Sequence, residues 1–481
     1  MPTGSPDTEM GSHPAYALTL AAVAAIGGFL FGFDSGVING TVSALQAAFA
    51  SDSIGTGFSV ASMLLGCALG ALLSGRVADR YGRKPVMVVT ALLFLLSALG
   101  SGWADSSSVF ILARVLGGLG VGAASVIAPT YIAEVAPAAW RGRLASLQQL
   151  AIVIGLFMAF VSNYAVARAA GSAQATWLAG AQAWRWMFWM ECVPALAYLF
   201  GSLLIPESPR FLVASGQVPA ARRIFAQLLG GDPDRKIAAV QASLQDKTRV
   251  RFHDLCLPGR LRLRPVVWIG LGAAMLQQLV GINVIFYYGA VLWQAVGFSE
   301  QDALWQNVIS GLVNTLSTLV ALTLVDRIGR KPLLLAGSAG MALTLGALAW
   351  LFGHASPKGT GALDLSPGEG WTALVLALTY VFFFAATWGP VLWVLLGEIF
   401  PNRIRGTATA AVTMAHWLAN FAITMSFPWL LHWVGLGLAY TLYAGAAAFS
   451  FLFVQRWVHE TRGRVLEEAH PYSASAGPQR P

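Results

Sequence analysis

Long apolar runs separated by short polar loops are the feature that most constrains how this sequence can fold. A helix needs about 20 apolar residues to cross ~30 Å of hydrocarbon. Twelve such runs recur, near residues 16–38, 58–76, 85–104, 109–130, 145–166, 184–205, 265–293, 306–325, 332–352, 371–396, 407–428 and 432–455. Only 11% of the residues are charged, against roughly a quarter in soluble domains. The sequence therefore predicts an all-α membrane protein with twelve transmembrane helices.

The runs form two sets of six on either side of a charged segment at 206–264. Within that segment Pro219 opens one helical pattern, Gly230-Gly231 ends it, and Asp232-Pro233 opens the next. The predicted organisation is a disordered N-terminal tail at 1–15, six-helix bundles at 16–205 and 265–455, a cytosolic helical segment at 206–264, and a cytosolic C-terminal tail at 456–481.

Basic residues mark one side of the predicted bundle. Lys and Arg cluster after spans 2, 4, 8 and 10 and in the 206–264 segment, whereas the loops at 39–57, 105–108, 294–305 and 429–431 contain none. Short loops rich in Lys and Arg stay in the cytoplasm. Both termini are therefore predicted to be cytoplasmic, which requires an even number of spans.

Other classes of protein are disfavoured by what the sequence contains. The net charge of +8 is accounted for by the basic loops rather than by a surface for nucleic acid. The three cysteines (Cys67, Cys192 and Cys256) are too few and too scattered for a disulfide framework or a metal site. The sequence also shows no nucleophile–base set, metal-ligand spacing or phosphate loop that would indicate an enzyme.

The two sets of spans carry matching motifs in the same order. DRYGRKP at 79–85 follows span 2 and DRIGRKP at 326–332 follows span 8. Acidic and basic residues after span 4 recur after span 10, and an acid after span 6 recurs after span 12. The sequence therefore predicts that the two halves are copies of one six-span unit. Such repeated halves are typical of transporters that bind substrate near the membrane midplane.

These motifs, with PESPR at 206–210 and QQLVGIN at 277–283, resemble the sugar porter family of the major facilitator superfamily over about residues 16–468. The resemblance is closest to bacterial sugar–proton symporters such as the xylose–proton symporters. It implies the major facilitator fold and transport of a sugar by alternating access.

Charged residues at the cytosolic helix ends are predicted to form salt bridges that hold the inner side closed in one conformation, because interface ion pairs commonly switch in rigid-body transitions. The resemblance implies the same role, and topology signalling with helix capping is the alternative. The predicted latch comprises Asp79, Arg83, Glu134, Arg141, Glu207, Arg210, Asp326, Arg330, Glu398, Arg405 and Glu460.

Side-chain amides suit a sugar site because they both donate and accept hydrogen bonds, although amides in spans also join helices. The resemblance implies a pocket lined by Gln149, Gln277, Gln278, Asn283, Asn314, Trp393, His416 and Trp417. His416 stands where the xylose–proton symporters have a glutamine, and Leu156 replaces another, so the identity of the sugar stays open.

Gating is expected from span 7 and span 10. Tyr287 and Tyr288 are predicted to help close the outer side, with core packing as the alternative. Gly389 and Pro390 interrupt span 10, because proline removes a helical hydrogen bond and glycine lets the backbone bend.

Away from the span ends, three charged residues lie within the spans: Asp34, Arg114 and Glu191. A charge at bilayer depth costs at least a few kcal/mol, so such residues are usually paired and functional. Asp34 is expected to pair with Arg114 and to carry a proton, because opening the pair changes the proton affinity of the carboxylate. The resemblance implies that Glu191 tunes this pair and that the acid at position 34 marks proton symport. A static ion pair and a helix end in the headgroup layer are the alternatives.

The sequence therefore predicts a secondary transporter that imports a monosaccharide (hexose or pentose) with a proton as coupling ion and no cofactor or metal. We expect a monomer in the lipid bilayer of the bacterial inner membrane, with no nucleic-acid partner. The alternatives are a proton-independent sugar uniporter, a sugar sensor that does not transport, and a drug–proton antiporter of the same fold.

Overall fold

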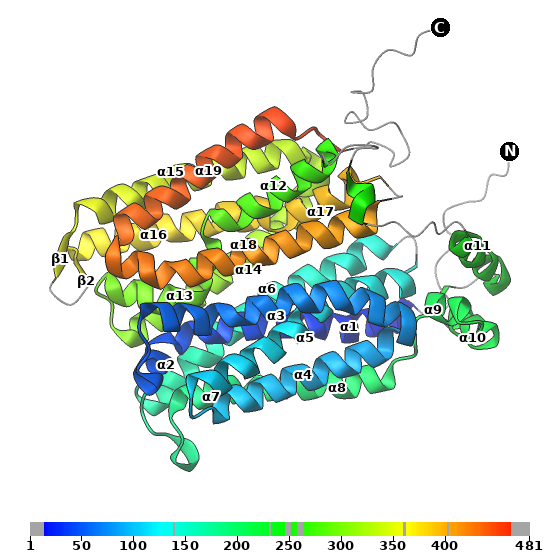
Figure 1. Cartoon of the computed structure of the whole chain (residues 1–481), viewed down its shortest axis with the longest axis horizontal. Coiled ribbons are helices and arrows are strands. Elements are labelled where there is room, and N and C mark those ends of the chain that lie inside the picture. The colour runs from blue at the N-terminus through cyan, green and yellow to red at the C-terminus, as the bar shows by residue number, and fades with distance from the viewer. Residues whose placement is uncertain are drawn as a thin grey trace, which may run out of the picture. The chain divides into compact units, whose positions relative to one another are not determined.

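The computed structural model describes residues 14–137, 140–229, 232–245, 252–256, 263–358, 362–401 and 404–462, and is almost entirely helical (Figure 1). Within these ranges eleven helical segments are long and apolar enough to cross a membrane. The 29-residue helix α18 (Arg405–Trp433) completes a set of twelve. The predicted all-α membrane fold is confirmed, while most of the two predicted tails lies outside the described residues.

The first six spans are continuous helices except for the sixth, which is divided in two. They are α1 (Pro14–Val37), α3 (Ser53–Tyr81), α4 (Arg83–Trp103), α5 (Ser107–Val135), α6 (Arg141–Ala170), and α7 (Ala183–Trp189) with α8 (Cys192–Leu204). Short elements join them: η2 (Ile38–Gly40), α2 (Val42–Phe49) and η4 (Leu178–Gly180).

The charged segment between the two sets of spans forms short helices: α9 (Pro209–Ala214), α10 (Val218–Leu229), α11 (Pro233–Gln245) and η5 (Phe252–Leu255). In α10 the buried residues Ala221, Ile224, Phe225 and Leu228 recur at the spacing of one helix face. The other face exposes Arg222, so this helix is amphipathic, as a surface helix should be.

The last six spans include two broken helices. Span 7 consists of α12 (Pro265–Leu279) and α13 (Ile282–Ala295), and span 10 of α16 (Pro367–Phe383), the π-helical turn η6 (Phe384–Trp388) and α17 (Gly389–Ile399). The others are α14 (Glu300–Ile328), α15 (Arg330–His354), α18 and α19 (Leu436–Trp457). A small antiparallel hairpin, β1 (Ser356–Lys358) with β2 (Ala362–Asp364), joins α15 to α16.

The repeated DRxGRKP motif makes the same turn in both halves. Gly82 and Gly329 precede α4 and α15 with φ of +103° and +105°, a region that favours glycine. A side chain at Gly329 would also collide with Glu460, whose Oε2 lies 2.7 Å from the Cβ position. The proline that ends each motif falls in the first helical turn, where its missing N–H costs no helical bond.

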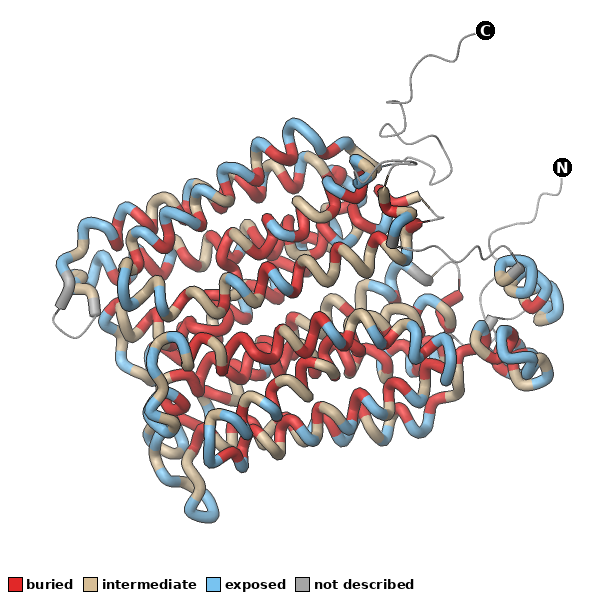
Figure 2. Tube along the Cα trace, viewed as in Figure 1, coloured by how far each residue is buried: buried red, intermediate tan, exposed pale blue. Residues whose placement is uncertain are grey.

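Backbone contacts divide the chain into two compact units. The described residues of the first unit lie within 1–37, 65–162 and 177–249, and those of the second lie within 38–64, 163–176 and 250–481. In both units the buried residues line the inner helix faces and many exposed ones lie on the outer faces (Figure 2). The second unit includes the ends of spans 1, 2 and 5 that lie opposite the basic loops. The predicted division into bundles at 16–205 and 265–455 stays a prediction.

Candidate functional site

A buried ion pair lies in the interior of the first unit. The guanidinium Nη1 of Arg114 on α5 donates to Oδ1 of Asp34 on α1, and Nη2 donates to the backbone carbonyl of Asp34 at 3.0 Å. The exposed fractions of the two residues are 0% and 1%. A side chain at Gly117 would meet Oδ2 of Asp34 at 3.0 Å, so glycine at this position lets α5 approach the carboxylate.

A second carboxylate belongs to the same site. Glu191, at the break between α7 and α8, is fully buried and interacts electrostatically with both Asp34 and Arg114. One guanidinium cannot neutralise two ionised acids, and burial disfavours an unpaired charge. The structure therefore brings the three predicted members together in one buried group.

An ordered chain of amides lies in the second unit. Asn283 at the start of α13 donates from Nδ2 to Oε1 of Gln278 on α12. Nε2 of Gln278 lies 3.2 Å from a ring nitrogen of His416 on α18. His416 is itself 5.1 Å from the ring of Trp393 and 5.4 Å from that of Trp417, between ring centroids. Five of the predicted sugar-binding residues thus form one contiguous polar and aromatic surface.

Gln277 contacts the break in span 10. Its Nε2 donates to the carbonyl of Trp388 at 2.7 Å and, more weakly, to that of Gly389 at 3.3 Å. The π-helical turn and Pro390 interrupt the regular helical ladder here, and broken helices need such outside partners in a membrane. Gln277 is therefore placed to stabilise the irregular turn.

The described residues show no hydrogen bond between this polar and aromatic surface and the other predicted binding residues, Asn314 and Gln149. Asn314 is buried on α14 in the second unit. Gln149 is half-buried on α6 in the first unit, and Leu156 lies seven residues further along the same helix and is buried. Trp393 has an exposed fraction of 37%, whereas its neighbours His416 and Trp417 are buried.

The two span-7 tyrosines contact α18. Tyr288 donates its hydroxyl to the carbonyl of Thr424 at 2.9 Å, and its ring packs 5.2 Å from that of Phe427. Asn420 donates to the hydroxyl of Tyr287 at 3.5 Å. Both tyrosines are buried, and their predicted role in gating stays a prediction.

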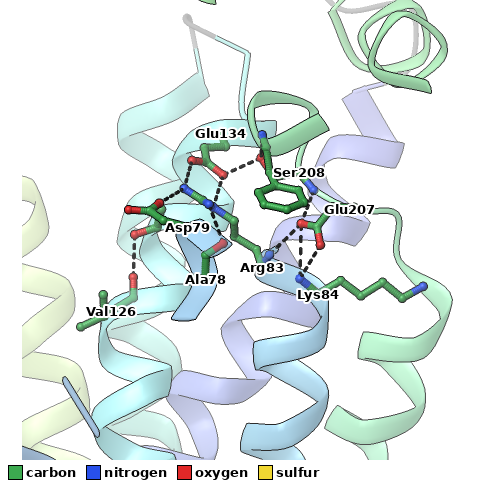
Figure 3. Close-up of polar contacts among 10 residues, drawn as sticks. Ala78, Asp79, Arg83, Lys84, Val126, Glu134, Glu207 and Ser208 are labelled. Atoms are coloured by element: carbon green, nitrogen blue, oxygen red, sulfur yellow. Dashed lines mark hydrogen bonds and ion pairs between the residues drawn. The ribbon is translucent and has the colours of Figure 1, made fainter. Parts of the chain in front are cut away.

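A charged network joins the basic loop after span 2 to the ends of spans 4 and 6 (Figure 3). Arg83 donates from Nε and Nη2 to the two oxygens of Glu134, each at 3.0 Å, and lies 3.2 Å from Asp79. The carboxylate of Glu207 accepts from the backbone N–H groups of Arg83 and Lys84 at the start of α4. An anion is favoured there by the exposed amides and the helix dipole.

The second unit repeats this network. Arg330 donates to both oxygens of Glu398 at 3.0 and 2.7 Å and to Asp326 at 3.0 Å. Glu460 accepts from the backbone N–H groups of Arg330 and Lys331, each at 3.0 Å. Each described network therefore lies within one unit, and the predicted switching of the latch stays a prediction.

Three predicted members of the latch stand apart. Arg405 donates to the carbonyl of Phe400 at 3.2 Å, so it caps the end of α17. Arg210 is exposed at the start of α9. The side chain of Arg141 lies outside the described residues.

Sequence reasoning missed the hydroxyls that complete both networks. Ser208 donates to Oε2 of Glu134 at 2.5 Å, and Thr461 donates to Oε2 of Glu398 at 2.6 Å. A signal was present, because a hydroxyl residue directly follows Glu207 and also Glu460.

Sequence reasoning also missed a hydrogen-bonded hub at the end of span 1. Oδ1 of Asn39 accepts from the backbone N–H of Ala290 at 2.9 Å and from Nδ2 of Asn307 at 2.7 Å. Its Nδ2 donates to the carbonyl of Phe286 at 2.9 Å. All these groups belong to the second unit, and no local pattern pairs residues so far apart in the chain.

A duplicated twelve-helix membrane bundle with broken helices, a buried acid–arginine group and a buried amide surface defines a secondary transporter. The family model described as "Sugar (and other) transporter" matches residues 20–472. The chain therefore belongs to this sugar transporter family of the major facilitator superfamily, and is a multi-pass membrane protein rather than an enzyme.

Named relatives match along nearly the whole chain. A "Glucose transport protein" of Synechocystis is 53% identical over 468 residues, covering 97% of this chain and 99% of the relative. The "D-xylose-proton symporter" of Escherichia coli K12 is 38% identical, covering 96% of both. The solved structure of the xylose transporter XylE of E. coli in a partially occluded inward-open conformation superimposes with a TM-score of 0.80 at 36% identity, covering 94% of this chain and all of that one.

Proposed function

We propose that this chain imports a monosaccharide together with a proton by alternating access, as a monomer in the bacterial inner membrane with both termini in the cytoplasm. The observation that carries the proposal is the buried group of two acids and one arginine, Asp34, Glu191 and Arg114. A simple sugar passage has no need of such a group, because sugar is uncharged. Intramembrane acids of this kind commonly serve as proton relays.

The coupling follows from the charge balance of this group. In the structure Arg114 holds Asp34 in the ion pair, and Glu191 lies buried beside both residues. When the pair separates, the carboxylate of Asp34 loses its positive partner and gains affinity for a proton. Loading and unloading of the proton thereby become tied to the conformation of the first unit.

The sugar is proposed to bind the surface of Gln278, Asn283, His416 and Trp393, with Gln277 beside it. The amides and imidazole supply donors and acceptors for hydroxyl groups, and an aromatic face suits the apolar side of a sugar ring. The printed names of the relatives are a glucose transport protein and a xylose–proton symporter. They support a hexose or a pentose as the substrate.

Replacing Asp34→Asn tests the coupling. In proteoliposomes with an inward proton gradient, the variant should lose accumulation of glucose or xylose but keep counterflow, which needs no net proton movement. Asp105→Asn is the matched control, because Asp105 is an acid on the surface, 90% exposed at its side chain and paired with Arg185. That control should accumulate sugar as the unaltered protein does.

Two results would separate this proposal from its main alternative. A proton-independent uniporter would equilibrate sugar without accumulation even before substitution, and sugar addition would not make the external medium alkaline. Retained accumulation by Asp34→Asn would show that the coupling group lies elsewhere. Leu156 supports the uniporter as an alternative, because facilitative glucose carriers resemble this sequence in having a leucine where the xylose–proton symporters have a glutamine.

A further inference from the structure

Four tryptophan rings form a continuous row along one edge of the first unit. The ring centroids of Trp177 and Trp186 lie 6.0 Å apart, those of Trp186 and Trp189 lie 5.0 Å apart, and those of Trp189 and Trp103 lie 6.1 Å apart. All three contacts are edge-to-face, the arrangement that aromatic pairs favour. The row runs from the loop before α7, along α7, to the end of α4.

The loop tip is fixed onto this row. Trp186 donates from Nε1 to the carbonyl of Leu178 at 3.0 Å, and the backbone N–H of Trp177 donates to the carbonyl of Ala181 at 2.8 Å. Ala179 holds a φ of +54°, which is unfavourable for a residue with a side chain. Surrounding contacts must maintain this strained turn, so the tip has a defined shape.

The chemistry of the loop is that of a membrane interface rather than of a water-exposed loop. Residues 169–184 contain no Asp, Glu, Lys or Arg, yet Leu178 is 50% exposed and Trp103 is 63% exposed. Arg185 lies at the margin, where it donates to Asp105 at 3.0 Å. Its guanidinium also lies 4.7 Å from the ring centroid of Trp184. An apolar tip bordered by an ion pair matches the boundary between acyl chains and headgroups.

The row is continuous with the lipid-facing surface of the same unit. Val89, Leu92 and Leu96 are exposed along α4 and lead toward Trp103, at spacings that place them on one helix face. The start of the loop that follows α6 is held by α14, because Glu300 accepts from the backbone N–H of Ala173 at 2.9 Å. In Figure 1 the rest of this loop projects past α7, and Figure 2 shows much of it exposed. A loop that extends sideways from the end of a span lies over the lipid beside that span.

We propose that the segment Trp177–Trp189, together with Trp103, is a membrane anchor whose partner is the lipid at the headgroup–acyl boundary. Tryptophan favours this layer because one end of its ring is apolar and the other hydrogen-bonds. Interfacial segments enter it by about 5–10 Å. The anchor would hold the first unit in register with the bilayer while the transporter changes conformation.

Site-directed fluorescence quenching tests the anchor. In a background with Cys67, Cys192 and Cys256 replaced by alanine, Leu178→Cys would be labelled with an environment-sensitive fluorophore and reconstituted in phosphatidylcholine–phosphatidylglycerol vesicles. Ser356→Cys is the control, because Ser356 is exposed at the start of β1. Trp103→Cys is a second test position at the other end of the row, should labelling at the tip disturb folding.

The expected result is several-fold stronger quenching at Leu178 and Trp103 by lipids that carry a nitroxide near the headgroup or the top of the acyl chain than by lipids that carry it near the chain end. Aqueous iodide should quench the control label but not these two. Iodide quenching of Leu178 equal to that of Ser356 would place the loop in water and overturn the proposal. Protection from both quenchers that disappears on dilution of the protein would show a second copy as the partner, and would overturn it equally.

Discussion

The hydrogen bonds of Asn39 are expected to stabilise one conformation of the transporter over the other. Helix α1 belongs to the first unit up to Val37, whereas Ile38–Gly40 belong to the second. Spans 2 and 5 cross the same division as unbroken helices. Span 1 is one continuous helical span, Ala15–Gly40, so a movement of the whole span relative to α13 and α14 would break the hydrogen bonds that Asn39 makes to them.

The size of the effect follows from those bonds. Asn39 makes three hydrogen bonds of 2.7–2.9 Å to α13 and α14, and one intramolecular bond contributes about 1 kcal/mol net. Asn39→Ala should therefore destabilise the conformation that contains them by about 3 kcal/mol. Since 1.4 kcal/mol corresponds to a factor of ten, the conformational equilibrium should shift by about 100-fold.

Cysteine accessibility measures this shift. In the cysteine-free background, Ser59→Cys places a thiol on the end of α3 that belongs to the second unit, where it is 3% exposed. Asn39→Ala should raise its labelling rate with a membrane-impermeant maleimide by one to two orders of magnitude, within the shift of about 100-fold. Thr41→Val is the matched control, because Thr41 is equally buried but donates only to Ile38 in its own turn, at 2.9 Å. Equal labelling rates in the two variants would refute the reasoning.

Three further predictions concern other parts of the molecule. Glu398→Gln removes the charge from the two-point contact with Arg330, which is worth about 1.5–3 kcal/mol. The thermal midpoint and the transport rate should therefore fall, while sugar binding measured by calorimetry should be retained. An unchanged transport rate would count against the latch. His416→Gln should change the relative affinity for glucose and xylose by about tenfold (1.4 kcal/mol), read from uptake competition, and an unchanged ratio would remove His416 from the pocket. Partial burial raises the pKa of Glu460, but four backbone N–H donors outweigh it and hold the pKa below its ordinary 4.5. Because the pKa is lowered in the folded protein, the ionised Glu460 stabilises the fold at neutral pH, and this stabilisation is lost as the pH falls below that ordinary value. The difference in melting temperature between the unaltered protein and Glu460→Gln should therefore shrink in acid. A constant difference would contradict this.

The fold was predictable because hydrophobic length and charge asymmetry act locally along the chain. The twelve apolar runs and the two copies of DRxGRKP can be recognised in the sequence without knowing which residues are in contact. The motif even contains its own structural explanation, since Gly82 provides a positive φ and Pro85 occupies a first helical turn. The sequence alone does not show the partner of each charge: the carboxylate of Glu207 accepts from the backbone N–H of Arg83, which is 124 residues away in the chain.

The candidate site was predictable where chemistry makes a residue unusual in a membrane. A carboxylate or an arginine inside a span needs a partner, so Asp34 and Arg114 could be expected to pair, and the resemblance added Glu191 to the same group. Asn39 and Asn307 could not be found this way, because neutral amides are common in spans and theirs are 268 residues apart. Their role becomes visible only in the folded structure, where the backbone groups of Phe286 and Ala290 also hydrogen-bond to Asn39.

Gln277 illustrates how one residue type serves two purposes in the same site. Its amide chemistry suggests a sugar ligand, yet its Nε2 is occupied by the carbonyls of Trp388 and Gly389. Its Oε1 accepts only a long bond of 3.5 Å from Gln278, so that oxygen retains capacity for a further donor. A sugar hydroxyl that donated to Oε1 would bind the one amide that also holds the irregular turn of span 10. Substrate binding and the shape of a broken helix would then share a single side chain, which is a direct physical route from ligand to conformational change.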